Sequence, residues 1–134
     1  MTLKLDGNSL NIDLVARIAR SGDKVEFAPE AKAKIEASAA LVQKLVERGE
    51  AIYGVTTGIG EFARIRISPE QGAELQRRII YSHAAGVGDP FPIENVRAAM
   101  LLRANTLARG NSGVRLQTAQ ILVDLLNKGI SPVV

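Results

Sequence analysis

Residues 53–60 read Tyr-Gly-Val-Thr-Thr-Gly-Ile-Gly, a loop that carries one aromatic side chain on very flexible backbone. Glycine reaches positive φ and allows close approach of a neighbour, so a glycine-rich loop can hold a single side chain at a defined place. Ordering such a segment costs conformational entropy. The phenol of Tyr53 is the group whose placement offsets that cost, and we predict a loop that presents it.

The residues alone leave two roles open for this loop, a structural connector and a catalytic loop. A phosphate-binding loop is excluded, because no Lys-Ser or Lys-Thr follows Gly60 and no Gly-x-Gly-x-x-Gly spacing occurs. Glu61 follows instead and would repel a phosphate. Taken by itself, the pattern favours a tight connector with a partly buried tyrosine over a catalytic loop.

Composition points to a mainly helical fold. The 134 residues suffice for one domain or for a piece of a larger one. Apolar residues make up 46% of the chain, whereas aromatic residues make up only 4% and tryptophan is absent. An interior of alanine and leucine favours closely packed helices, so we expect a mainly α fold with a few short strands.

Several classes of protein are not expected. The net charge is only +3 and the basic residues are scattered, which argues against nucleic-acid binding. Without cysteine and with a single histidine, neither a disulfide framework nor a metal site is expected. The N-terminus lacks the apolar run of a signal peptide, and no stretch is long enough to span a bilayer. We expect a soluble cytoplasmic protein without a membrane partner.

Patterning predicts where the elements lie. Strands are expected at 2–5 and 24–27, and helices are expected at 12–21, 29–48, from 69 to before Gly86, 93–109 and 115–128. Asn11 is a predicted N-cap, and Ser68 with Gln71 predicts a capping box. Helical spacing places His83 on one face with Leu75 and Ile79, which predicts an inward histidine, more often a core residue than a catalytic one.

Three motifs occur in order along the chain. The loop at 53–60 is followed by Leu75-Gln76 with Ser82-His83-Ala84-Ala85-Gly86-Val87-Gly88, and then by Arg103-Ala104-Asn105, Leu107-Ala108-Arg109-Gly110 and Ser112-Gly113-Val114-Arg115. Together they resemble the aromatic amino acid lyases, a family that includes histidine, phenylalanine and tyrosine ammonia-lyases and the related aminomutases. The resemblance extends over essentially the whole chain from about Leu3.

The resemblance implies a mostly helical homotetramer whose active sites are shared between subunits and act on an amino acid. Residues 1–110 would form the N-terminal domain, with short strands and the Tyr53 loop, and 111–134 would begin the central helical domain. Tyr53 would be the catalytic base, supported by loop residues Gly54, Thr57, Gly58 and Gly60, and His83 would bind substrate. An ordinary phenol is seldom ionised at neutral pH, so such a base needs donors that favour phenolate, and the loop amides are candidates.

The chain departs from the family pattern at the electrophile. The family implies 4-methylidene-imidazol-5-one, which forms autocatalytically from Ala-Ser-Gly, and no such triad occurs in these residues. The stretches 96–107 and 121–126 within the last two predicted helices are apolar on most faces, as in larger assemblies. We therefore expect the N-terminal part of an ammonia-lyase of amino acid catabolism, inactive by itself.

Substrate and reaction type remain open at this point. The Ser82-His83 pair favours a polar ring, so histidine ammonia-lyase is the first expectation. Val-Thr-Thr-Gly with Glu61 leans toward the alternatives, a tyrosine ammonia-lyase or a tyrosine 2,3-aminomutase. The non-enzymatic alternative is a fragment that folds or associates without turnover.

Overall fold

The computed structural model describes residues 2–134, without the side chain of residue 69. Its contacts divide the chain into two compact units, one formed by residues up to Leu41 together with Asp89–Val134 and the other by Val42–Gly88. The predicted mainly α fold with short strands is confirmed. The domain boundary expected between residues 110 and 111 concerns the family's central domain and stays a prediction.

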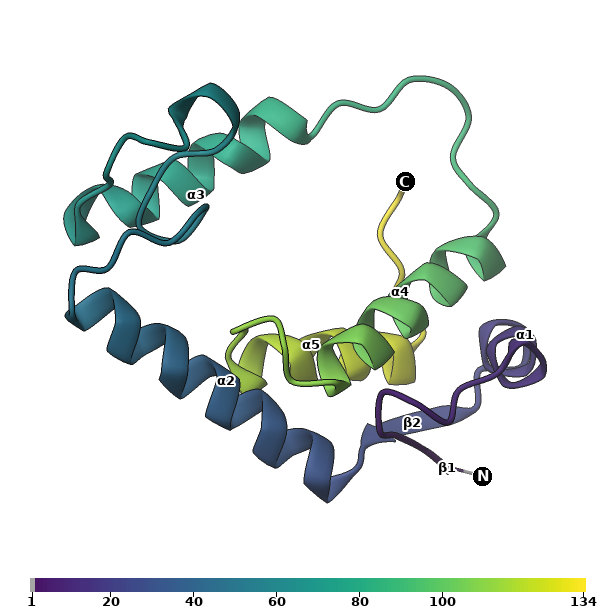
Figure 1. Ribbon diagram of the computed structural model, residues 1–134. Coiled ribbons are helices and arrows are strands. Elements are labelled where there is room, and N and C mark those ends of the chain that lie inside the picture. The colour runs from purple at the N-terminus through teal and green to yellow at the C-terminus, as the bar shows by residue number, and fades with distance from the viewer. Residues whose placement is uncertain (1) are drawn as a thin grey trace. The chain divides into compact units, whose positions relative to one another are not determined.

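The first unit is built on a pair of parallel strands. Strand β1 (Thr2–Leu5) pairs with β2 (Lys24–Phe27) so that Leu3 lies opposite Val25, and α1 (Ile12–Ser21) connects them. Helix α4 (Ile93–Ala108) contacts α1 and β1, and α5 (Leu116–Lys128) contacts α4 and β2 (Figure 1). A core of aliphatic side chains with one phenylalanine lies between these elements, including Leu5, Ile18, Val25, Phe27, Leu101 and Val123.

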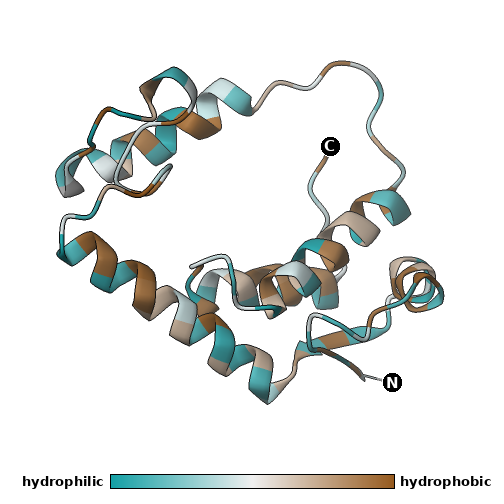
Figure 2. Ribbon diagram, in the orientation of Figure 1, coloured by the Kyte–Doolittle hydropathy of each residue, from teal (hydrophilic) through white to brown (hydrophobic). Residues whose placement is uncertain are grey.

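The boundary between the units falls within α2 (Pro29–Glu47), after Leu41. Ala31 and Ile35, near the start of α2, are buried in the first unit, whereas Leu41 is 57% exposed. Apolar and polar residues are interspersed along α2 (Figure 2). At Gly110 the backbone approaches α2 so closely that a Cβ would lie 2.5 Å from Lys34 Cβ.

The second unit contains the loop and α3 (Pro69–His83). Between them lies a short 3-10 turn, η1 (Gly60–Phe62). The predicted capping box is confirmed, since Gln71 N–H donates to Ser68 Oγ and Ser68 N–H donates to Gln71 Oε1. Within residues 2–134, no helix is both long and apolar enough to cross a lipid bilayer.

Candidate active site

Two antiparallel stretches pair at Thr57 and Arg66 and close the segment that follows Tyr53. Gly58 N–H donates to the carbonyl of Ile65 over 3.0 Å, and Ile67 N–H donates to the carbonyl of Thr56 over 2.9 Å. Because these bonds join residues 56–58 to residues 65–67, the residues between them are held on a short, bent backbone.

Tyr53 lies on this loop with its ring largely in solvent. Its side chain is 65% exposed, and its phenolic oxygen accepts a hydrogen bond from Gly60 N–H over 3.3 Å. This N–H is one of the loop amides expected to converge on the phenolic oxygen. The expected convergence of loop amides is therefore partial, since Gly54 N–H donates instead to Thr57 Oγ1 and Gly58 N–H to a carbonyl.

The four predicted supporting residues each have a physical role in the loop. Gly54 and Gly60 adopt positive φ, +71° and +58°, where other residues are strained. A Cβ on Gly58 would lie 2.6 Å from Phe62 Cβ and 2.8 Å from the carbonyl oxygen of Phe62. Thr57 is only 4% exposed, and its hydroxyl lies 3.0 Å from the carbonyl oxygen of Gly58. The loop therefore tolerates few other side chains at these positions.

His83 is the last residue of α3, and the structure corrects its predicted inward orientation. Leu75 and Ile79 are half-buried, but His83 is exposed, because the helix ends there and its apolar face is only partly covered within the unit. Nδ1 of the ring lies 2.8 Å from Ile79 O and 2.9 Å from Ser82 Oγ. A carbonyl only accepts, so the neutral tautomer that fits donates from Nδ1 and presents Nε2 as an acceptor.

Tyr53 and His83 both belong to the second unit. Within residues 2–134, no hydrogen bond joins the two side chains. Nor do three or more His, Asp or Glu side chains of this part of the chain gather as metal ligands. The arrangement supplies one phenol and one imidazole, a pair suited to proton transfer and to binding a polar ring.

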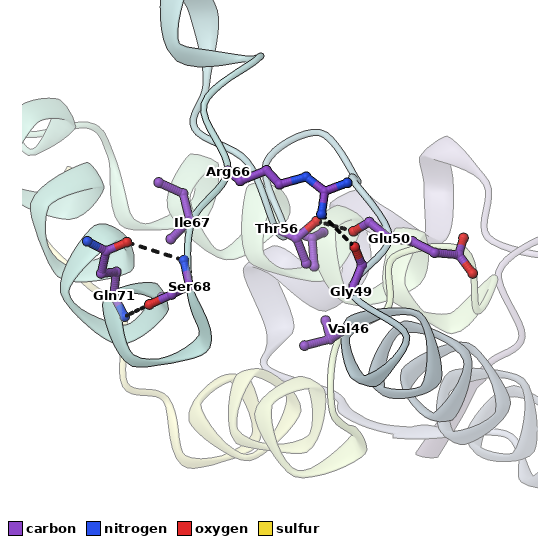
Figure 3. Close-up of a pocket in the computed structure, with 10 residues that line it drawn as sticks. Val46, Gly49, Glu50, Thr56, Arg66, Ile67, Ser68 and Gln71 are labelled. Carbon is purple, nitrogen blue, oxygen red and sulfur yellow. Dashed lines mark hydrogen bonds between the residues drawn. The ribbon is translucent and has the colours of Figure 1, made fainter.

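Sequence reasoning did not single out Thr56, which lies within the loop, or Arg66, which follows it. Both line a cavity of about 460 Å³ within the second unit (Figure 3). The guanidinium of Arg66 donates to the carbonyl of Gly49 over 3.2 Å, and the hydroxyl of Thr56 donates to the carbonyl of Glu50 over 2.5 Å. The sequence signal for Thr56 was that threonine hydroxyls commonly form hydrogen bonds with nearby backbone groups.

Comparison with known proteins decides the family. The family model described as aromatic amino acid lyase matches residues 10–134. The chain belongs to the aromatic amino acid lyase family. The resemblance carried by the motifs at 53–60, 82–88 and 103–115 is thereby confirmed.

Named members of the family are similar over nearly all of this chain. The histidine ammonia-lyase of Chloroflexus aurantiacus is 51% identical over 96% of it, and that of Natranaerobius thermophilus is 45% identical over 98%. The chain spans about a quarter of the length of these relatives, 25% and 26% respectively.

Solved structures of lyases and aminomutases have the same fold. Tyrosine aminomutase from Streptomyces globisporus superposes with a TM-score of 0.94 at 36% identity, covering 98% of this chain and 25% of that one. Histidine ammonia-lyase from Trypanosoma cruzi has a TM-score of 0.85 at 38% identity, covering 95% and 24%. Because both proteins share this fold, it does not by itself distinguish their reactions.

Proposed function

We propose that the whole protein to which these residues belong is a histidine ammonia-lyase, which converts L-histidine to urocanate and ammonia. One observation carries the proposal. Relatives named histidine ammonia-lyase are 44–51% identical to this chain over 96–99% of its length. In this reaction a base removes a proton from Cβ, the C–H electron pair becomes the new double bond, and the amine leaves with the C–N pair.

Tyr53 is the proposed base. Tyr53 is exposed, and its phenolic oxygen, which accepts a hydrogen bond from Gly60 N–H, would abstract the Cβ proton. His83 is the proposed substrate-binding residue, with Nε2 available to the imidazole of histidine. Gly54, Thr57, Gly58 and Gly60 would hold Tyr53 in place through the backbone geometry described above.

The electrophile that the family implies does not fit these residues. It forms from Ala-Ser-Gly, and residues 1–134 contain no such triad. The 134 residues therefore cannot form the group, and we assign them no step that passes through it. Our proposal is that turnover belongs to the whole protein and that this segment alone is inactive.

The proposal also includes a homotetrameric assembly and a cytoplasmic location. A cytoplasmic homotetramer with shared active sites would cover the large apolar side chains that this chain leaves in solvent. The second unit exposes Phe62, Ile80 and Tyr81, which are 61%, 64% and 74% accessible. Exposed apolar side chains in such number are typical of surfaces that associate.

Tyrosine is the second candidate substrate, because structures named tyrosine aminomutase reach TM-scores of 0.94 to 0.96 with this chain. The test incubates the whole protein with L-histidine and, separately, with L-tyrosine. Urocanate and ammonia from histidine are the expected products. Coumarate would identify a tyrosine ammonia-lyase, and β-tyrosine would identify an aminomutase. The 134-residue segment, assayed in parallel, should form none of these.

A further inference from the structure

Thr56 uses all of its hydrogen-bonding groups inside the loop that carries Tyr53. Its N–H donates to Ile52 O over 3.0 Å, and its carbonyl accepts from Ile67 N–H over 2.9 Å. Its hydroxyl accepts from Ile52 N–H over 2.8 Å and donates to Glu50 O over 2.5 Å. One residue thus joins the stretch that precedes Tyr53 to the stretch that returns from the loop.

Side-chain packing does little to hold this part of the loop. Behind Thr56 lies the cavity of about 460 Å³, bordered by Val46, Val55 and Ile67 (Figure 3). Val55 is 38% exposed, and Tyr53 is 65% exposed. Because Tyr53 and Val55 are exposed and a cavity lies beside Thr56, hydrogen bonds supply much of the restraint on the backbone next to Tyr53.

We propose that Thr56 is a positioning residue for Tyr53 and that its hydroxyl sets where the phenol stands. The inference rests on the proposed role of Tyr53 as the base. The hydroxyl accepts from the amide of Ile52, the residue directly before Tyr53, and it holds the Glu50 carbonyl two positions further back. Movement of this stretch shifts the tyrosine as a whole, and small misplacements of a catalytic group have large effects on rate.

Thr57 differs from Thr56 in the groups that its hydroxyl contacts. Its hydroxyl accepts from Gly54 N–H over 3.3 Å and lies 3.0 Å from Gly58 O and 3.4 Å from Ile52 O. Thr57 therefore supports the turn around Tyr53, whereas the Thr56 hydroxyl binds the Ile52 N–H and the Glu50 carbonyl. Both threonines contact the backbone of Ile52, but through different groups.

Thr56→Val is the informative substitution, because valine keeps the shape of threonine but has a methyl group in place of the hydroxyl. Ile52 N–H and Glu50 O then lose their partner, whereas Thr56→Ser keeps it. Thr118→Val is the matched control, since Thr118 is exposed in the first turn of α5. All variants are made in the whole protein.

The measurements are steady-state turnover of L-histidine and amide hydrogen exchange. Thr56→Val should lower kcat by about tenfold to a hundredfold while KM changes by less than about threefold. The amide of Ile52 should exchange faster, the thermal midpoint should stay close to that of the parent, and Thr56→Ser should recover most of kcat. The inference is overturned if Thr56→Val has parental kcat, if serine fails to rescue, or if Thr118→Val loses as much.

Failure of the proposed function is distinguishable from failure of this inference. If the parent protein converts no amino acid, the proposed roles of Tyr53 as the base and of Thr56 as its positioning residue are both refuted. Hydrogen exchange needs no substrate, so unchanged exchange at Ile52 and Ile67 in Thr56→Val would also overturn the role of the hydroxyl in holding the loop. Faster exchange there would sustain that role.

Discussion

The backbone N–H of Gly60 donates a hydrogen bond to the phenolic oxygen of Tyr53 over 3.3 Å. This bond joins two residues at opposite ends of the motif at 53–60, and Gly60 reaches the required backbone conformation with φ of +58°. The motif therefore supplies both the proposed base and a backbone donor that contacts its phenolic oxygen.

Removing the phenolic oxygen should abolish most of the proposed turnover. In the whole protein, Tyr53→Phe should lower kcat/KM for L-histidine by about 10²–10⁴-fold, the range for loss of general base catalysis. Urocanate absorbance measures the rate. Tyr81→Phe is the matched control, because Tyr81 is the other tyrosine of the chain and is 74% exposed on α3. Similar losses in both variants would refute the assignment of the base to Tyr53.

A methyl group at Gly58 should displace the loop. In Gly58→Ala the new Cβ would lie 2.6 Å from Phe62 Cβ and 2.8 Å from the Phe62 carbonyl oxygen, and backbone cannot move aside cheaply. We expect a large loss of kcat in this variant, and we expect the backbone amides of position 58 and of Ile67 to exchange faster. Gly72→Ala serves as the comparison, because a Cβ on this helical glycine meets nothing within 4 Å. It should stabilise α3 by about 0.5–1 kcal/mol.

Arg97 should be required for stability of the first unit. It is 7% exposed, and its guanidinium donates to Ala19 O, Ile18 O and Leu126 O over 3.0, 3.3 and 3.2 Å. These carbonyls belong to the last turns of α1 and α5, where a cation also meets the negative end of each helix. Arg97→Met should cost about 1–3 kcal/mol through the carbonyls left unpaired.

The thermal midpoint of the whole protein measures this cost. Arg103→Met, on the same helix but exposed, should change stability by no more than about 0.5 kcal/mol. A midpoint for Arg97→Met equal to that of Arg103→Met would show that the buried guanidinium contributes nothing.

The side-chain amide of Asn127 should protect the outer edge of β2. Val25 N–H donates to Asn127 Oδ1 over 2.9 Å, and Asn127 Nδ2 donates to Val25 O over 2.8 Å. Asn127→Ala removes both bonds and should cost about 1–2 kcal/mol, with faster exchange of the Val25 amide. Asn95→Ala, at an exposed position of α4, should leave that amide unchanged. Equal exchange in the two variants would contradict the expected protection.

Acid should weaken the turn at Asp6. The N–H groups of Ser9 and Asn8 hold the pKa of Asp6 below its ordinary value of 3.8, so the folded state favours the carboxylate. Its stabilising effect is complete above the ordinary pKa and is lost as pH falls through the lowered one. The whole protein should therefore lose thermal stability below about pH 3.8 relative to Asp6→Asn, whose amide oxygen accepts without titrating. Parallel acid profiles of the two proteins would disprove this contribution.

The secondary structure was predictable because its signals are local. Asn11 caps α1 as expected, accepting from Leu14 N–H over 2.9 Å, and Ser68 with Gln71 caps α3. Both strands have the predicted bounds, and each helix boundary lies within a residue or two of its prediction wherever a boundary was given. Such signals rest on contacts between residues three or four apart, which the order of residues already specifies.

His83 and Arg97 mark where prediction failed. Helical spacing predicted a buried histidine, but spacing identifies only a shared face and not whether another element covers it. Arg97 interrupted an apolar pattern and carried no local signal of its role. Its three carbonyl partners lie 29 to 79 positions away, and only folding brings them to it.

The order of residues by itself determined the helices, the strands, the glycine-rich loop and, through three spaced motifs, the family. Only the tertiary structure decided that Gly60 faces the phenol, that Thr56 ties the loop on both sides, and that Arg97 joins the ends of two helices. Two physical reasons apply. The contacts of Gly60 and Thr56 depend on an irregular loop conformation that no repeating pattern of residues specifies, although their partners are near in the sequence. The partners of Arg97 lie far away along the chain and meet it only after distant segments have packed together.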